Sequence, residues 1–356
     1  MTTSTRKNFL LCLALVGVST VSVWAQSNTI PAGYFTVNIN AGTGSSYSTS
    51  VLSFPLQQSA DSTVGGVLVG PTGQMVGQVT GITSTTITNT NAAWGAGQLS
   101  VAATPYLIQF TSGTATGRTF LISTTTANTA TMLTLDSSET TDLTTLGIVP
   151  GTDTYQIVAA DTISSVFGTP ASTGVLGGTS VSNADTIQIY NGTVWKNYFY
   201  NTGTSSWTLS APPINSNNVV IRPDTGVIYN RLANTPLSLV LMGQAPAIAR
   251  QASVANSSIT FLSNFWPTST TLLTSNIQNI PGWVAGAFGT ADTVLVFGSN
   301  NVWTQYYFNG THWYQAAPPI VSDSVAIPAG SAVFLTKKAS SAGQSILSQS
   351  LPYSLN

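Results

Sequence analysis

Charged side chains are scarce in this chain. Asp, Glu, Lys and Arg make up 5% of its 356 residues, against roughly 25% in typical soluble domains. Recognition of nucleic acid needs clustered Lys and Arg to neutralise phosphates, so the composition argues against a nucleic-acid partner. Disorder is excluded as well, because disordered chains combine high net charge with few aromatic residues. This chain has a formal net charge of −1 and 9% aromatic residues.

Cysteine and histidine are almost absent, with only Cys12 and His312 in the sequence. Zinc sites need several such ligands. A Ser-His-Asp triad needs a histidine as its base, so any such mechanism would depend on His312. That residue stands beside Trp313 in an expected hairpin, where we interpret it as a surface residue. With a single glutamate and no glycine-rich phosphate loop ending in lysine, the sequence predicts neither a cofactor nor an enzymatic activity.

The first 25 residues have the features of a secretory signal peptide. Arg6 and Lys7 precede an apolar run at 9–21. The small residues at 23 and 25 fit a signal-peptide cleavage site before Gln26. The run is shorter than the ~20 residues that a membrane anchor needs. We therefore expect export to the periplasm, the outer surface or the medium, with no transmembrane segment in the mature chain. Cleavage would leave 7 basic and 10 acidic residues, a net charge of about −3.

An internal repeat organises the mature chain. Residues 184–207 and 291–313 each contain an Asp before an apolar strand, an aromatic strand that begins with Trp, and a second Trp. Both segments lead to a Pro-Pro pair, at 212–213 and 318–319. Apolar and polar residues alternate through these stretches, which is typical of half-buried strands. Each copy offers enough strands for an antiparallel sandwich.

The two copies differ in length because about a hundred extra residues interrupt the first. Short strand patterns separated by turn residues run through this extra segment, which favours a small β-barrel or sandwich of its own. We therefore predict an all-β protein of two repeated antiparallel β-sandwich-like units with an inserted module in the first. The predicted divisions are a signal peptide at 1–25, a first repeat at 26–59 plus 159–245, an inserted module at 60–158, and a second repeat at 246–356.

The aromatic strand of the repeat supplies the candidate binding residues. Alternation places Trp195, Asn197 and Phe199 on one face and Lys196 with two tyrosines on the other. If one face stays open, its rings could stack on sugars, and the candidate platform is Tyr198, Tyr200, Trp207, Tyr306, Phe308 and Trp313. The alternative is cross-strand core packing, worth about 0.5–1.5 kcal/mol per aromatic pair beyond burial.

One acidic cluster, formed by Asp136, Glu139 and Asp142, lies in the inserted module. Carboxylates on an exported loop could bind calcium, which prefers oxygen ligands. They could also form the carboxylate pair of a glycosidase. A solvated loop is the simpler interpretation of this cluster.

The repeated frame resembles that of a family of exported bacterial β-rich proteins of unknown function. The shared elements are Asp-apolar, Trp-x-x-Tyr-x-Tyr/Phe and apolar-x-Pro-x-Gly segments. Here they are Asp185, Trp195, Tyr198, Tyr200 and 221–226 in the first copy, and Asp292, Trp303, Tyr306, Phe308 and 327–330 in the second. The resemblance implies export and a β-rich fold, and it carries no activity.

Three functions remain open from the sequence. The first is a non-catalytic structural or surface-associated protein that acts by binding or assembly, since a surface with little charge offers little repulsion to self-association. The second is a carbohydrate-binding module that uses the aromatic platform on a polysaccharide or another cell-surface component. The third is a polysaccharide-acting hydrolase that uses the acidic cluster or His312.

Overall fold

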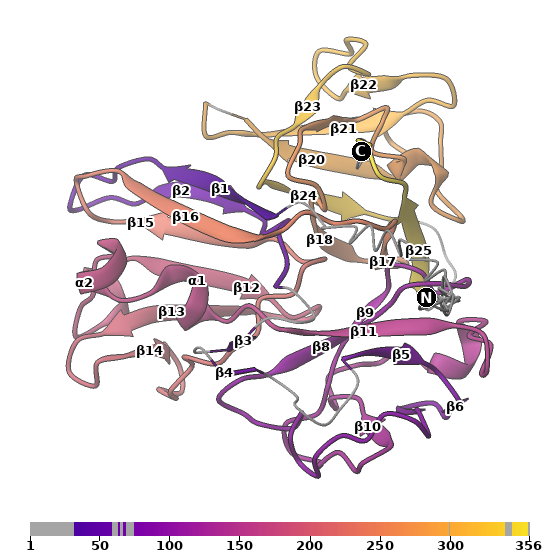
Figure 1. Cartoon of the computed structure of the whole chain (residues 1–356). Coiled ribbons are helices and arrows are strands. Elements are labelled where there is room, and N and C mark those ends of the chain that lie inside the picture. The colour runs from indigo at the N-terminus through magenta and orange to yellow at the C-terminus, as the bar shows by residue number, and fades with distance from the viewer. Residues whose placement is uncertain are drawn as a thin grey trace, which may run out of the picture.

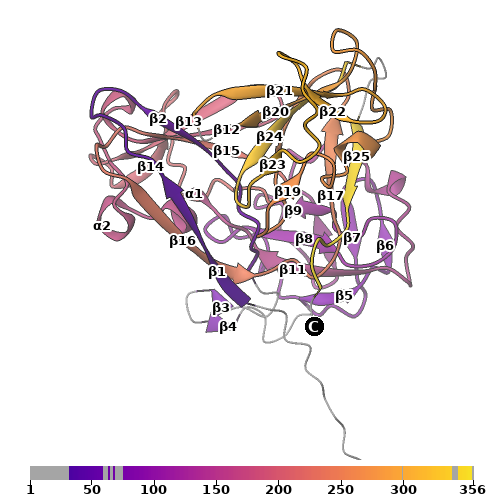
Figure 2. The same cartoon turned by 90° about the horizontal axis from the view of Figure 1, so that it is seen from above.

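Antiparallel β-sheets form most of this protein. The computed structural model describes residues 32–58, 63–64, 67–68, 75–298, 300–338 and 344–354, so the expected signal peptide lies outside the described residues. The named strands all pair in antiparallel fashion, which confirms the predicted all-β class. Figure 1 shows three lobes that meet near the centre of the molecule, and Figure 2 shows them from above.

The two copies of the repeat each contain a five-stranded sheet with the same order of equivalent strands. The first sheet runs β14 (Ser206–Leu209), β13 (Trp195–Asn201), β12 (Thr186–Tyr190), β15 (Val227–Arg231) and β2 (Ser48–Leu52). The second runs β22 (Trp313–Gln315), β21 (Trp303–Phe308), β20 (Thr293–Phe297), β24 (Ala332–Thr336) and β18 (Ile259–Ser263). The matching order shows that the repeated sequence frame specifies the same strand pairing twice.

A two-stranded ribbon shares the core of each five-stranded sheet. In the first copy it pairs β1 (Ala32–Ile39) with β16 (Leu237–Gln244), and in the second β17 (Arg250–Ala255) with β25 (Gln344–Gln349). Val37, Ile39 and Leu239 of the first ribbon join one buried cluster with Trp207 and Tyr229 of the sheet. Alternating residues of the ribbon enter this core because successive side chains of a strand point to opposite faces.

The inserted segment has a hydrophobic core of its own, whose members lie between Met75 and Ile157. Its larger sheet has the order β5 (Val76–Gln78), β11 (Thr154–Ala159), β8 (Tyr106–Phe110) and β9 (Thr119–Leu121). Its smaller sheet is β10 (Met132–Thr134), β7 (Thr86–Thr88) and β6 (Gly81–Ile82). The short pairs β3 (Thr63–Val64) with β4 (Val67–Leu68), and β19 (Thr270–Thr271) with β23 (Ala326–Ile327), complete the strands. The core of the inserted segment is separate from the main cores of the two repeats, although β11 runs one residue past the predicted division at 158.

Two short helices, which the sequence analysis did not anticipate, follow the inserted segment. They are α1 (Ile163–Phe167) and α2 (Pro170–Thr173). Thr162 begins α1 with a capping box, in which its hydroxyl accepts the Ser165 amide while Ser165 accepts the Thr162 amide. Thr169 and Ser172 repeat the arrangement at α2. Ser and Thr at these spacings therefore start helices in a Thr-rich chain that otherwise favours strands. Among the described residues, no helix has the length and apolar character needed to cross a bilayer.

The hairpin between β21 and β22 differs from the expectation. The Asn309-Gly310 pair predicts a two-residue turn, but the strands end at Phe308 and resume at Trp313. The Asn309 side chain accepts the amides of Thr311 and His312, which stabilises the longer loop. The expected pairing of Phe308 with Trp313 is nevertheless present, with ring centroids 5.6 Å apart.

The lobes meet through close backbone approaches. A Cβ atom on Gly226 would lie 2.4 Å from the Cβ of Ala332 in the other repeat, so only glycine fits there. Gly117 of the inserted segment has φ +86°, and a Cβ atom on it would lie 2.1 Å from the Ala249 carbonyl oxygen. An apolar cluster that includes Val51, Phe261 and Ala332 joins the two repeats. These contacts place the three lobes around a common junction.

Candidate functional site

The predicted aromatic platform is largely part of the core, so this prediction is wrong for most of its members. Tyr198 and Tyr306 are each 7% exposed, and Trp207 and Trp313 are 1% and 0% exposed. Tyr200 and Phe308 are half-buried, because each packs on the tryptophan of the next strand, Tyr200 on Trp207 and Phe308 on Trp313. The alternation of the strand directs this face inward, where the rings serve cross-strand packing.

The other face of the same strands divides into two parts. At one end, Trp195 of the first repeat packs against Phe261 and Phe334 of the second, with ring centroids 5.6 and 5.9 Å away. Trp303 of the second repeat also packs on Phe334, at 4.8 Å. These rings form the junction between the repeats, where Trp195 stays 40% exposed, and the far end of the face carries a second group of rings.

At that far end, three aromatic side chains form a partly exposed row that we call the tyrosine strip, consisting of Phe288, Tyr307 and Tyr314. Tyr307 and Tyr314 lie opposite each other on β21 and β22, with centroids 5.8 Å apart and ring planes at 25°. Phe288 is 40% exposed and lies 5.7 Å from Tyr307. The Lys338 ammonium donates to the carbonyls of Phe288 and Gly289 and so fixes the loop that carries the phenyl ring.

The first repeat does not contain this strip. The residues equivalent to Tyr307 and Tyr314 are Phe199 and Thr208, which also pair across two strands. They are 6% and 5% exposed. The fold therefore does not require an exposed aromatic row at this place, and the second repeat alone has one. The strip was not predicted from the sequence. Alignment of the two copies, which places Tyr314 at the position of Thr208, could have indicated it.

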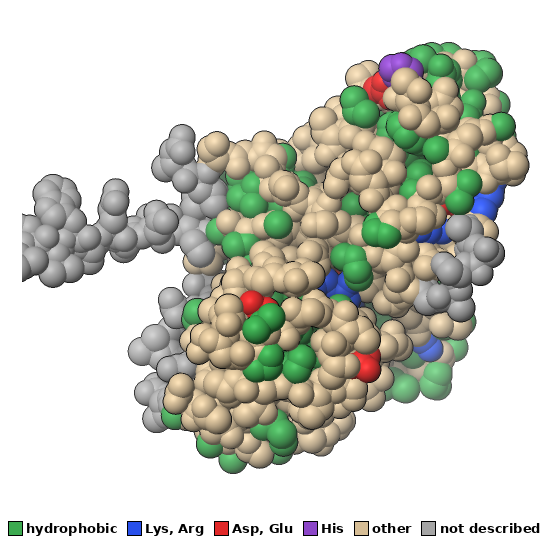
Figure 3. All heavy atoms as spheres, turned by 90° about the vertical axis from the view of Figure 1, so that its right-hand side faces the viewer, with side chains coloured by type: hydrophobic (Ala, Val, Ile, Leu, Met, Phe, Trp, Pro, Cys, Tyr) green, Lys and Arg blue, Asp and Glu red, His purple; other side chains and the backbone are tan. Residues whose placement is uncertain are grey.

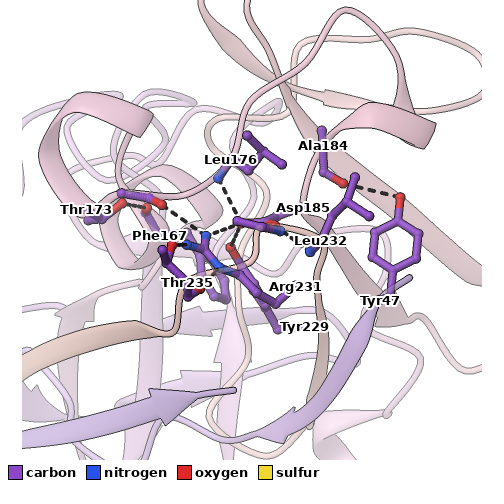
Figure 4. Close-up of polar contacts among 12 residues, drawn as sticks. Tyr47, Phe167, Thr173, Leu176, Ala184, Asp185, Tyr229, Arg231, Leu232 and Thr235 are labelled. Atoms are coloured by element: carbon purple, nitrogen blue, oxygen red, sulfur yellow. Dashed lines mark hydrogen bonds and ion pairs between the residues drawn. The ribbon is translucent and has the colours of Figure 1, made fainter. Parts of the chain in front are cut away.

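Asp185, the repeated Asp of the first copy, lies at the centre of a buried polar cluster (Figure 4). It is 0% exposed and accepts hydrogen bonds from the Leu176 and Leu232 amides and from the Tyr229 hydroxyl. The Arg231 guanidinium, 2% exposed, pairs with it at 2.5 Å. Burial, followed by the neighbouring carboxylate, raises the pKa of Tyr229 well above its usual value. The carboxylate thus ties the loop before β12 to the end of β15.

Asp292 repeats this role in the second copy with fewer partners. Its two oxygens accept the amides of Val284 and Lys338 at 2.8 and 2.7 Å. These two amides correspond to those of Leu176 and Leu232, while Leu335 and Lys337 replace the tyrosine and the arginine. Both repeated Asp residues are therefore architectural, since their oxygens are engaged by neighbouring loops.

The acidic cluster of the inserted segment does not converge on one point. Asp136 accepts from Ser138, and Asp142 caps the turn at Thr144. Glu139 turns away from both and pairs with Arg222 of the first repeat at 2.5 Å. Within the described ranges, no three His, Cys, Asp or Glu side chains are grouped so that they could hold a metal ion. The structure therefore does not bring the speculative calcium ligands together.

His312 lies in the loop between β21 and β22 and contacts one carboxylate. Its Nδ1 is 2.6 Å from Asp323, whose other oxygen accepts the Trp313 amide. Burial favours the protonated form of Asp323, but the Trp313 amide and His312 favour the carboxylate more strongly, so the pKa of Asp323 falls below its usual value. In the first repeat, Asn217 accepts the equivalent Trp207 amide. The His312–Asp323 pair is accordingly a variation on a structural contact of the repeat.

A second candidate site is the groove where the three lobes meet, which we call the junction groove. It has a volume of about 520 Å³, within the range of small-ligand sites. The inserted segment contributes Arg118, Glu139 and Thr141 to its walls, the first repeat contributes Tyr190, Lys196 and Arg222, and the second contributes Thr260 and Phe261. Its polar groups come from segments that are far apart in the sequence.

Outside these places the visible surface is mostly uncharged, and Figure 3 shows that acidic and basic side chains on one face occur singly or in small groups. No family model, curated protein or solved structure matches this chain. The proposals below therefore depend on the geometry of the chain itself.

Proposed function

We propose that this is an exported, non-catalytic binding protein that uses the tyrosine strip to hold a polysaccharide of the cell surface or its surroundings. The observation that carries the proposal is the near-parallel stacking of Tyr307 and Tyr314 on a sheet face where both are half-buried, beside the 40% exposed Phe288, whereas the equivalent Phe199 and Thr208 are buried. Aromatic side chains that expose a large apolar surface and a polar tip are suited to pyranose rings, which present an apolar face and a rim of hydroxyls.

The use of the ionisable groups supports a binding role over hydrolysis. The acids of the predicted cluster contact separate groups of the protein: Glu139 pairs with Arg222 and accepts the Leu121 amide, Asp136 accepts from Ser138, and Asp142 accepts from Thr144. A glycosidase needs two carboxyl groups that face the same bond, one to give a proton and another to meet the sugar or a water molecule. The three carboxyl groups do not converge in this way in the observed geometry.

The test is a glycan array, followed by titration of the full mature chain with cellohexaose as a neutral probe. If each tyrosine contributes about 1 kcal/mol of stacking, Tyr307→Ala and Tyr314→Ala should each weaken binding about fivefold and the double variant about thirtyfold. Tyr34→Ala is the matched control, because Tyr34 is 77% exposed on a different lobe. Equal affinity of the double variant and the wild type would overturn the assignment of the strip.

Self-association is a second candidate, favoured by the outer face of the β1–β16 ribbon. Tyr34, Val240 and Met242 are 77%, 61% and 74% exposed there, and Tyr34 lies opposite Met242. The equivalent ribbon of the second repeat instead presents Gln251, whose side chain donates to Thr114 of the inserted segment. We propose that a second copy of the chain covers the first ribbon. This face is apolar and carries no charge, so the same faces of two copies would not repel each other.

Sedimentation of the wild type and of a Val240→Lys/Met242→Lys variant tests the ribbon. We expect a concentration-dependent dimer for the wild type and a monomer for the variant. A monomeric wild type at all accessible concentrations would exclude this surface as a dimer interface.

A further inference from the structure

The junction groove contains more positive than negative charge, which is unusual in a chain with more acids than bases. Its charged lining comprises three basic side chains, Arg118, Lys196 and Arg222, and two acidic ones, Glu139 and Asp224. Both acids bind the same base: Glu139 lies 2.5 Å and Asp224 3.4 Å from Arg222. Arg118 and Lys196 are thus left without an acid of their own.

Arg118 is the more unusual of the two. Its side chain is buried, with the residue 4% exposed, and its guanidinium lies 5.2 Å from the centre of the Phe120 ring. One nitrogen, Nη2, donates to Thr141 at 3.3 Å, while Nη1 has no hydrogen-bond partner among the described residues. A buried guanidinium with an unused donor costs free energy unless another group satisfies it.

Lys196 lies on the opposite wall, on β13 of the first repeat. Its ammonium makes no hydrogen bond or ion pair with any residue in the described part of the chain. In the second repeat, the equivalent position is Thr304, which pairs with Val296 as Lys196 pairs with Ile189. The lysine is therefore not required by the repeated strand.

The remaining walls of the groove are uncharged and mixed in character. Hydroxyl groups come from Thr140, Thr141 and Thr260, an amide from Asn191, and apolar surface from Tyr190 and Phe261. Such walls suit a ligand with many hydroxyls and small apolar faces, and the two unpaired cations suit a ligand that also carries negative charge.

We propose that the junction groove binds an anionic sugar of the uronic-acid type, with its carboxylate on Arg118 and Lys196 as a second cationic contact. Guanidinium groups bind carboxylates through two parallel hydrogen bonds. Since Nη1 is buried, this proposal requires the Arg118 side chain to turn toward the groove and to exchange its long bond to Thr141 for the carboxylate. The site is separate from the tyrosine strip and does not depend on it.

Calorimetric titration of the full mature chain with oligogalacturonate at low ionic strength tests this site. Arg118→Gln should weaken binding about tenfold to a hundredfold, the effect of losing a charge-assisted contact. Lys196→Gln should weaken it about threefold, as expected for a more exposed cation. Arg118→Gln could also loosen the junction between the lobes. Lys196→Gln therefore tests the loss of a cation separately, at a half-buried position on a strand.

Three comparisons define the outcome. In the Tyr307→Ala/Tyr314→Ala background, which weakens neutral-glycan binding at the tyrosine strip, a neutral galacto-oligosaccharide should bind at least tenfold more weakly than oligogalacturonate. Tyr307→Ala and Lys338→Gln, both at the tyrosine strip, should leave uronate binding unchanged. The proposal is overturned if oligogalacturonate does not bind, if the neutral sugar binds equally well, or if only the strip variants weaken binding.

Discussion

Removing the charge of Asp185 should destabilise the first repeat far more than the same change at Asp292 in the second. In Asp185→Asn the side chain keeps its size but loses its charge, and the Arg231 guanidinium, 2% exposed, is left without a counterion. Breaking a buried ion pair by removing one partner costs about 3–5 kcal/mol. The new NH₂ group would also face donors, namely the Leu176 amide or the Leu232 amide.

Asp292→Asn is the matched control, because Asp292 is equally buried and accepts two backbone amides but binds no arginine. An asparagine oxygen can satisfy only one of those amides at its best geometry, so we expect a loss of about 1–3 kcal/mol. The predicted difference between the two variants is therefore about 2 kcal/mol. It is a consequence of the Arg231 and Tyr229 contacts, which the second repeat lacks.

Denaturant unfolding followed by tryptophan fluorescence measures both variants. Trp207 lies in the first core and Trp313 in the second, so the unfolding of either repeat changes the tryptophan fluorescence. A variant with both Asp185→Asn and Arg231→Met should lose less stability than the sum of the two single changes, because no unpaired charge remains. Equal losses for Asp185→Asn and Asp292→Asn would refute the argument from the buried ion pair.

Two further predictions concern pH and the packing of the lobes. Burial raises the pKa of Asp161 to about 6, above the roughly 3.9 of an unfolded chain, so its contribution to stability is full below about pH 4 and is lost as the pH rises through 6. Asp161 keeps some solvent contact, which reduces the effect. Relative to the wild type, the free energy of unfolding of Asp161→Asn in urea should therefore rise by about 1–2 kcal/mol between pH 4 and pH 8. A difference between the two proteins that stays constant with pH would contradict this. Gly226→Ala should separate the two repeats because the added Cβ meets Ala332 and Phe261, and faster limited proteolysis should report it. Gly33→Ala, with open space at the Cβ position, should show no change, and equal proteolysis of the two variants would contradict the close packing at Gly226.

The strands and their repetition could be predicted from the sequence because alternation is a local pattern, whereas the pairing of β2 with β15 joins residues 48–52 to 227–231 and has no local signal. Alternation around Tyr198 and Tyr306 indicated strands, and the recurrence of Trp207 as Trp313 indicated that the same sheet occurs twice. Alternation alone does not say which face of a strand is buried, and the candidate platform was placed on the inward face. The helix α1 was not predicted, because its start depends on the capping geometry of Thr162 and Ser165 and not on an apolar periodicity.

The two candidate sites were harder to predict because they depend on contacts between distant segments. Glu139 and Arg222 meet across 83 residues of sequence, and no local pattern indicates that they form the base of a groove. The arrangement of the outer sheet face could not be predicted either, since Trp195 meets Phe261 and Phe334 only once the two repeats pack together. Export and the signal peptide stay predictions, because those residues lie outside the described part of the chain.

The stoichiometry of neutral-glycan binding tests the central claim most directly. The account assigns glycan binding to the strip of Tyr307, Tyr314 and Phe288, for which the first repeat has only the buried pair Phe199 and Thr208. Calorimetric titration of the mature chain with cellohexaose should therefore give one site per chain, and Tyr307→Ala/Tyr314→Ala should weaken it about thirtyfold. Two equivalent sites per chain, or one site with unchanged affinity in the double variant, would contradict the account.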